Sequence, residues 1–138
     1  MKKIILLFIG LILGLTLNAQ SVAYKAAMKP YLGEWVQHKS GVTMHLKIEK
    51  SGSKVTLKYK AVNTEDGSPK TYYSSFKNVK WTGNGFKCTK TTDDGYIIVE
   101  TFTKIDSNTI NGRFQSFSKS NGKLIPRLDE DLGDFHNW

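Results

Sequence analysis

The chain has a single cysteine, Cys88, and only three prolines among its 138 residues. One cysteine excludes a disulfide framework within the chain, so the fold has to depend on its hydrophobic core. A lone cysteine of this kind is most often a small buried hydrophobe. Arginine is also scarce, because Arg113 and Arg127 are the only two in the chain. Since arginine is the residue that favours bidentate phosphate contacts, this composition argues against nucleic acid as a partner.

Sequence motifs of known enzyme chemistry are missing as well. The chain contains no phosphate-binding loop, no Gly-x-Ser-x-Gly nucleophile elbow and no dinucleotide-binding fingerprint. The acidic pairs Glu65-Asp66 and Asp93-Asp94 lie in turn-like sequence, where such residues usually bond to the local backbone. We therefore expect a protein that is not an enzyme, with no catalytic residue and no cofactor.

Three histidines are the remaining candidates for a metal site. A turn over Lys39 to Val42 would place His38 opposite Thr43 and His45 opposite Val36, on a solvent-facing side of the hairpin. Two histidines without a third ligand make an incomplete zinc site, and His136 lies far away in the sequence. We expect these residues to be surface polar groups and predict no metal site.

The only long apolar run of the chain lies at its N-terminus. Lys2 and Lys3 precede the apolar stretch 4–15, and Ala19 offers a small residue for cleavage before Gln20. This order is typical of a secretory signal peptide over 1–19, and the stretch is shorter than the roughly 20 residues of a membrane-spanning helix. We expect an exported protein, periplasmic or secreted, with no transmembrane segment in the mature chain. Because Gln20, and not a cysteine, directly follows the cleavage site, it should not be a lipoprotein.

From Gly33 onward, apolar and polar residues alternate with period two. Residues 54–62 are the clearest case, because one face is apolar and the other is almost entirely lysine and threonine. The predicted strands are 33–38, 42–50, 54–62, 71–79, 84–91, 95–104, 109–119 and 123–128. Short turns such as Ser51-Gly52 make neighbouring strands antiparallel, and a break in the pattern near Gly112 indicates a β-bulge. Eight such runs predict an all-β, antiparallel, up-and-down, eight-stranded barrel.

The opening of the first predicted strand carries a family resemblance. Gly33, Glu34 and Trp35 follow directly after a short lead-in. This Gly-x-Trp resembles the N-terminal signature of the lipocalins and the wider calycin group, and the chain looks most like the small exported lipocalin-like domains of bacteria. The resemblance implies that Trp35 packs across the closed end of the barrel under an arginine from a late strand. Arg113 and Arg127 both fit that structural role, and we favour Arg113.

Charge is distributed unevenly over the mature chain. Up to Leu128 it has 18 Lys or Arg against 8 Asp or Glu, whereas the last ten residues contain four acids. We therefore expect a lipocalin-like barrel domain over 20–128 and an acidic tail over 129–138. The lysines are spread along the sequence, which favours solvated outer faces. Contact with an anionic surface is the alternative, while a membrane-embedded barrel would need apolar outer bands that 54–62 lacks.

Aromatic residues on the expected inner faces are the best candidates for a binding site. They are Tyr59, Tyr72, Phe76, Phe86, Tyr96, Phe102 and Phe114. An eight-stranded barrel is just wide enough to be filled by side chains or to hold one small ligand. We expect an exported, non-enzymatic binding protein that holds a small apolar or amphipathic molecule. The alternative is a filled barrel that binds a protein or an envelope polyanion through its basic surface.

Overall fold

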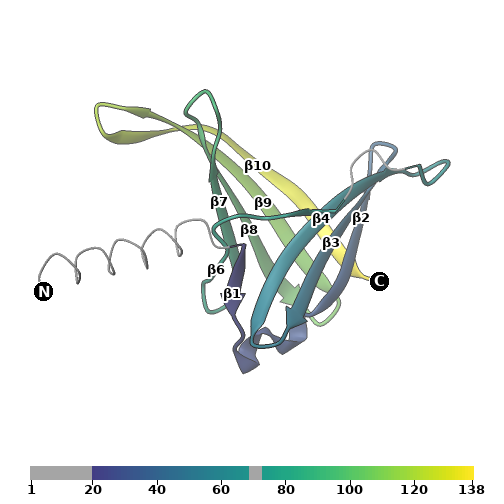
Figure 1. Ribbon diagram of the computed structural model, residues 1–138. Coiled ribbons are helices and arrows are strands. Elements are labelled where there is room, and N and C mark those ends of the chain that lie inside the picture. The colour runs from purple at the N-terminus through teal and green to yellow at the C-terminus, as the bar shows by residue number, and fades with distance from the viewer. Residues whose placement is uncertain (1–19, 69–72) are drawn as a thin grey trace, which may run out of the picture.

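The computed structural model describes residues 20–68 and 73–138, which are almost entirely antiparallel β-structure (Figure 1). The strands are β1 (Ser21–Ala23), β2 (Gly33–Lys39), β3 (Val42–Ser51), β4 (Lys54–Asn63), β5 (Ser74–Ser75), β6 (Lys80–Trp81), β7 (Gly85–Thr91), β8 (Ile97–Asp106), β9 (Thr109–Ser120) and β10 (Lys123–Asn137). A short 3-10 helix, η1 (Ala26–Tyr31), joins β1 to β2. The sheet order is β1-β4-β3-β2-β10-β9-β8-β7-β6, with β5 also paired to β4. The sheet curls into a nearly closed barrel.

The prediction of an antiparallel all-β barrel is confirmed, but the count of eight strands is wrong. The structure adds β1, and in the described part of the predicted strand 71–79 it has only the two-residue strand β5, with the two-residue β6 directly after it. Residues 71 and 72 of that prediction lie outside the described part of the chain. Between β5 and β6, Asn78 has a φ of 50°, a left-handed conformation that a continuous strand does not contain. The described part of this prediction, 73–79, therefore belongs to a segment that crosses between two parts of the sheet.

The acidic C-terminal residues form part of the barrel wall, since the predicted boundary after Leu128 falls inside β10. Three of the four carboxylates of this stretch bond to side chains on β9. Asn111 donates hydrogen bonds to Asp131 and Asp134, at 2.9 and 3.0 Å, and Arg113 forms an ion pair with Asp129. Because these acids have partners on the neighbouring strand, the acidic stretch continues as a strand.

The irregularity expected near Gly112 is present, although the bulge itself lies on the neighbouring strand. The register of β10 against β9 shifts between Asp131 and Gly133, directly opposite Gly112. A side chain at Gly112 would meet Phe135 at 3.1 Å and Phe102 at 3.4 Å. The absence of a side chain at Gly112 thus allows two aromatic rings to pack over this part of the sheet.

One end of the barrel is filled by buried side chains where η1 lies across the strands (Figure 1). Trp35 is fully buried, and its Nε1 donates a 2.9 Å hydrogen bond to the carbonyl of Tyr31. The ring of Tyr31 makes edge contacts with Trp81 and Phe86, and its hydroxyl donates to the carbonyl of Asn84. The expectation that Trp35 packs in the barrel interior is therefore met at this end.

The barrel wall is interrupted between β4 and β7, which do not pair with each other. The chain from β5 to β6 crosses this interruption. In the middle of the crossing, the backbone amide of Phe76 donates a 2.9 Å hydrogen bond to the carbonyl of Leu57 on β4. The ring of Phe76 contacts Tyr59 on one side and Phe102 on the other, with centroids 4.9 and 5.4 Å apart. An irregular segment, and not a paired strand, therefore covers this side of the barrel.

Candidate functional site

A cavity of about 460 Å³ lies where β4 and β7 fail to pair. Its walls come from β4, from the crossing segment, from β7 and from β8. The lining residues are Tyr59, Ser75, Phe76, Lys77, Asn78, Cys88, Thr89, Lys90, Thr91 and Glu100. This volume falls within the range of about 300–1,000 Å³ that small-molecule sites usually have. We call this space the gap cavity.

A second, smaller space of about 180 Å³ lies inside the barrel, and we call it the inner pocket. Its apolar walls include Met44, Leu46, Phe102, Phe114, Leu132 and Phe135. An apolar cavity of about 150 Å³ is already large enough to hold one benzene molecule. Tyr59, Phe76 and Glu100 line both spaces, so the inner pocket and the gap cavity adjoin each other at these three side chains.

Glu100 is the acidic residue shared by both cavities. It lies in the middle of β8, with Cys88 and Phe114 as its neighbours on the adjacent strands. Burial raises the pKa of Glu100, and the more distant charge of Lys90 lowers it by a smaller amount. The carboxyl group forms no hydrogen bond or ion pair with any residue in the two described ranges. Glu100 is thus a carboxyl group that faces cavity space without an internal partner.

Asn78 and Cys88 complete the polar lining of the gap cavity. The side-chain amide of Asn78 donates a 2.9 Å hydrogen bond to the carbonyl of Thr89, which orients the amide. Its oxygen Oδ1 is buried and accepts no hydrogen bond from the part of the chain that the structure describes. Burial, together with the charge of Glu100, strongly raises the pKa of the Cys88 thiol. This thiol therefore stays protonated at neutral pH and is a poor nucleophile.

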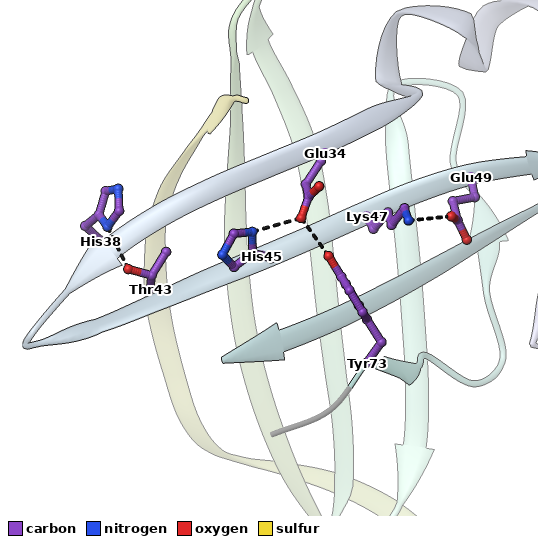
Figure 2. A network of polar contacts seen from close by, with 7 residues as sticks. All are labelled: Glu34, His38, Thr43, His45, Lys47, Glu49 and Tyr73. Atoms are coloured by element: carbon purple, nitrogen blue, oxygen red, sulfur yellow. Dashed lines mark hydrogen bonds and ion pairs between the residues drawn. The ribbon is translucent and has the colours of Figure 1, made fainter. Parts of the chain in front are cut away.

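The outer face of β2, β3 and β4 carries a separate polar network around Glu34 (Figure 2). Glu34 Oε1 lies 2.8 Å from His45 Nδ1 and accepts a 2.6 Å hydrogen bond from the hydroxyl of Tyr73. Partial burial acts to raise the pKa of Glu34, but the bonds from Tyr73 and His45 hold it below its usual value. The ammonium groups of Lys47 and Lys60 lie 5.5 and 4.6 Å from the centre of the Tyr73 ring. This network ties the chain just before β5 to the outside of the barrel.

The histidines occupy the positions expected from the hairpin. His38 pairs with Thr43 and His45 with Val36 in the register of β2 and β3. His38 Nδ1 is 2.8 Å from the hydroxyl of Thr43, while His45 is covered by Glu34 and by an edge contact with the ring of Trp138. Among the described residues, no three His, Cys, Asp or Glu side chains gather into a group that could hold a metal ion.

The structure places four of the seven predicted lining residues at the cavities. Tyr59, Phe76, Phe102 and Phe114 line one or both of them. Phe86 is instead buried at the closed end of the barrel, against Tyr31 and Trp81. Tyr96 is 40% exposed in the turn before β8 and lines neither cavity. Tyr72 lies outside the described residues.

The predicted pair of Trp35 and Arg113 is wrong. Trp35 is fully buried inside the barrel, whereas Arg113 is exposed on the outer face, where its guanidinium binds Asp129. Side chains alternate along a strand, so the inward position of Phe114 requires its neighbour Arg113 to point outward. A different cation lies near the closed end, because Lys104 Nζ is 6.0 Å from the centre of the Tyr31 ring.

Glu100 and Asn78 are the site residues that the sequence prediction missed. The signal for Glu100 was present, since it has the same parity as Ile98 and Phe102 and therefore occupies an inward position in β8. An acidic residue at an inward position of an apolar pattern is a candidate for function. Asn78 carried no such signal, because its oxygen is buried only through contacts with distant strands.

Comparisons with known proteins do not add to this description. No protein-family model matches the chain, and neither the curated proteins nor the solved structures give a match. Within the described residues, none of the helical structure is long and apolar enough to span a membrane. The two cavities are therefore the features of this fold that bear on its function.

Proposed function

We propose that this chain is an exported binding protein of the lipocalin-like kind, which holds one small amphipathic molecule and is not an enzyme. The observation that carries the proposal is the junction of the two cavities at Tyr59, Phe76 and Glu100. The inner pocket offers apolar walls to one end of a ligand. The gap cavity offers hydroxyl, amide and charged groups to the other end. A site of this form suits a molecule with an apolar body and a polar head.

Native mass spectrometry of the chain from Gln20, purified without detergent from an exporting host, tests this proposal. We expect a discrete added mass that disappears on denaturation. The variant Phe114→Trp adds volume at the inner pocket and should lose this mass. Phe117→Trp is the matched control, because Phe117 has the opposite parity on β9 and lies outside the lining of both cavities.

A bare mass would contradict the proposal if it persisted after incubation with fatty acids, haem, isoprenoids and amphipathic amines. Retention of the added mass by Phe114→Trp, at the level of Phe117→Trp, would place the ligand elsewhere on the protein.

Export is tested on the same preparation. We expect the N-terminal sequence of the exported product to start at Gln20, which an uncleaved N-terminus would contradict.

One feature favours a second function, which is attachment to an anionic surface. The tip of the β9–β10 hairpin extends away from the barrel (Figure 1). It exposes the apolar side chains of Leu124, Ile125 and Leu128, and Lys123 and Arg127 on the same strand are exposed as well. Apolar and basic groups together suit the surface of an anionic bilayer. Cosedimentation with anionic vesicles at low salt should then fall as salt rises, and absence of binding at low salt would exclude this function.

A further inference from the structure

Two hydrogen-bond acceptors in the gap cavity have no donor within the described residues. One is the carboxyl group of Glu100, and the other is Oδ1 of Asn78. The amide group of Asn78 is already oriented by its bond to the carbonyl of Thr89, so Oδ1 is the atom left over. Buried acceptors are almost always satisfied in folded proteins. Oδ1 of Asn78 is such a buried acceptor, and the partly buried carboxyl group of Glu100 lies on the same cavity, so both are available to the donors of a ligand bound there.

The positions of the charged groups decide which kind of donor fits best. Lys77 and Lys90 also line the gap cavity, but both are exposed, so their ammonium groups can remain in water at its rim. Within the described residues neither forms an ion pair with Glu100, which is partly buried. The acid thus lies at the inner end of the gap cavity, where the inner pocket begins.

An anionic head group bound to the rim lysines would place its apolar tail directly against the carboxyl group of Glu100. Contact between an apolar chain and an unpaired carboxylate is unfavourable, because it removes water from the charge without replacing it. A cationic head group avoids this cost, since its N–H groups can donate to Glu100 and Asn78 while its apolar part enters the inner pocket.

We propose that the gap cavity selects a protonated amine attached to a small apolar group, with Glu100 and Asn78 accepting its hydrogen bonds. This inference rests on the proposed function and narrows it to one class of ligand. Tyr59 and Phe76, which lie between the two cavities, would contact the carbon atoms next to the nitrogen. Aromatic rings near an ammonium group add further attraction through their electron-rich faces.

Isothermal titration of the full mature chain with octylamine, octanoate and octanol separates the ligand classes. The three probes each contain eight carbon atoms and differ in the head group, with one of the carbons of octanoate belonging to its carboxylate. We expect octylamine to bind most tightly, and Glu100→Gln to weaken its binding by about tenfold or more, because a charge-assisted bond is lost. Octanol binding should change much less. Glu65→Gln, which removes an exposed acid of the turn after β4 that lines neither cavity, is the control and should leave octylamine binding unchanged.

A second variant, Lys90→Gln, is expected to strengthen octylamine binding, whereas Glu100→Gln weakens it. Lys90 lies close enough to lower the pKa of Glu100, so its charge also repels a bound ammonium group. Its removal should tighten octylamine binding by about two- to fivefold. If octanoate bound most tightly and Lys90→Gln weakened it, the amine proposal would be overturned while the binding function remained.

Two further outcomes distinguish failure of the amine proposal from failure of the proposed binding function. Failure of all three probes, together with a ligand mass retained in native mass spectrometry, would overturn the amine proposal alone. Failure of all three probes together with a bare mass would overturn both. Equal octylamine affinity in the wild type and in Glu100→Gln would also overturn the role assigned to Glu100.

Discussion

Two glutamates on opposite faces of the same barrel wall show how one residue type serves different purposes. Glu34, on the outer face, is bonded to His45 and Tyr73, and these bonds hold its pKa below the usual value. Glu100, on the inner face, faces cavity space with no such partner among the described residues, and its pKa is raised by burial. The outer carboxylate is occupied by contacts that stabilise the fold. The inner one is left available, as a binding group has to be.

The two glutamates also differ in their surroundings, which are polar and charged around Glu34 and mostly apolar around Glu100. On the outer face Glu49 forms ion pairs with Lys47 and Lys58, at 2.9 and 3.4 Å, so acids and lysines there already have partners. On the inner face the neighbours of Glu100 are mostly aromatic and apolar. We therefore expect the contacts of the outer face to contribute modestly to the free energy of unfolding. The inner face should contribute most of it, and it also carries the proposed binding site.

The largest expected effect concerns the apolar part of the inner face. Phe102 is almost fully buried and its ring contacts those of Phe76 and Phe135. Phe102→Ala should lower the free energy of unfolding by about 3–5 kcal/mol, as measured by urea denaturation. Phe117→Ala, on the outward side of β9, should cost much less. Equal losses for the two variants would show that the inner face is not the main source of stability.

Replacement of the inner acid should stabilise the empty protein. Glu100→Gln removes a partly buried, unpartnered charge, and we expect the free energy of unfolding at pH 7 to rise by about 1 kcal/mol. Because the folded-state pKa of Glu100 lies above its unfolded value, the ionised carboxyl destabilises the fold only above that range. The gain should therefore disappear as the pH falls below the ordinary glutamate pKa. Urea denaturation at several pH values measures it, and a loss of stability at pH 7 would contradict the assignment.

The outer network should respond in the opposite direction and by a smaller amount. Tyr73→Phe removes the hydrogen bond to Glu34 and should lower the free energy of unfolding by about 0.5–1 kcal/mol at pH 7. The lowered pKa of Glu34 means that its contribution is present above the ordinary glutamate pKa and is lost as the pH falls through the folded-state pKa. The difference between wild type and variant should therefore narrow in acid. An unchanged difference between pH 7 and pH 3 would show that Glu34 is not involved.

The smallest effect is expected at Arg113. Its ion pair with Asp129 is solvent-exposed, and exposed pairs contribute little to stability. Arg113→Gln should therefore leave the midpoint of urea denaturation within experimental error. A clear loss would mean that the outer face carries more stability than its exposure suggests, and it would weaken the contrast between the two faces.

Local sequence patterns predicted the fold where short turns fix the pairing of strands. The turn at Ser40-Gly41 sets the register of β2 and β3, so the positions of His38 and His45 followed directly. The prediction for Arg113 failed because it assigned an interior role to both Arg113 and Phe114, which are neighbours on one strand and cannot share a face. The resemblance to the lipocalins favours Arg113 as the partner of Trp35, whereas the alternation of side chains along β9 excludes it.

The candidate site itself depends on contacts that are distant in the sequence. The gap cavity exists because β4 and β7 do not pair, and nothing local to either strand indicates this. Asn78 becomes a buried acceptor only because its amide reaches Thr89 on β7. Glu100 is the exception, since its inward position in β8 follows from alternation alone. Sequence reasoning could thus have identified the acid but not the cavity that surrounds it.

Cys88, which lines the gap cavity next to Glu100, provides the protein with a built-in chemical probe. It is the only thiol in the chain, so any modification by a thiol reagent occurs at this one position. Because the thiol is buried and its pKa is raised, it reacts slowly with a small aromatic disulfide, which has to enter the gap cavity to reach it. The rate at which the coloured aromatic thiolate is released then measures how readily the reagent reaches the gap cavity. A ligand bound in the cavity would slow the modification of Cys88, so occupancy of the cavity can be followed without any label.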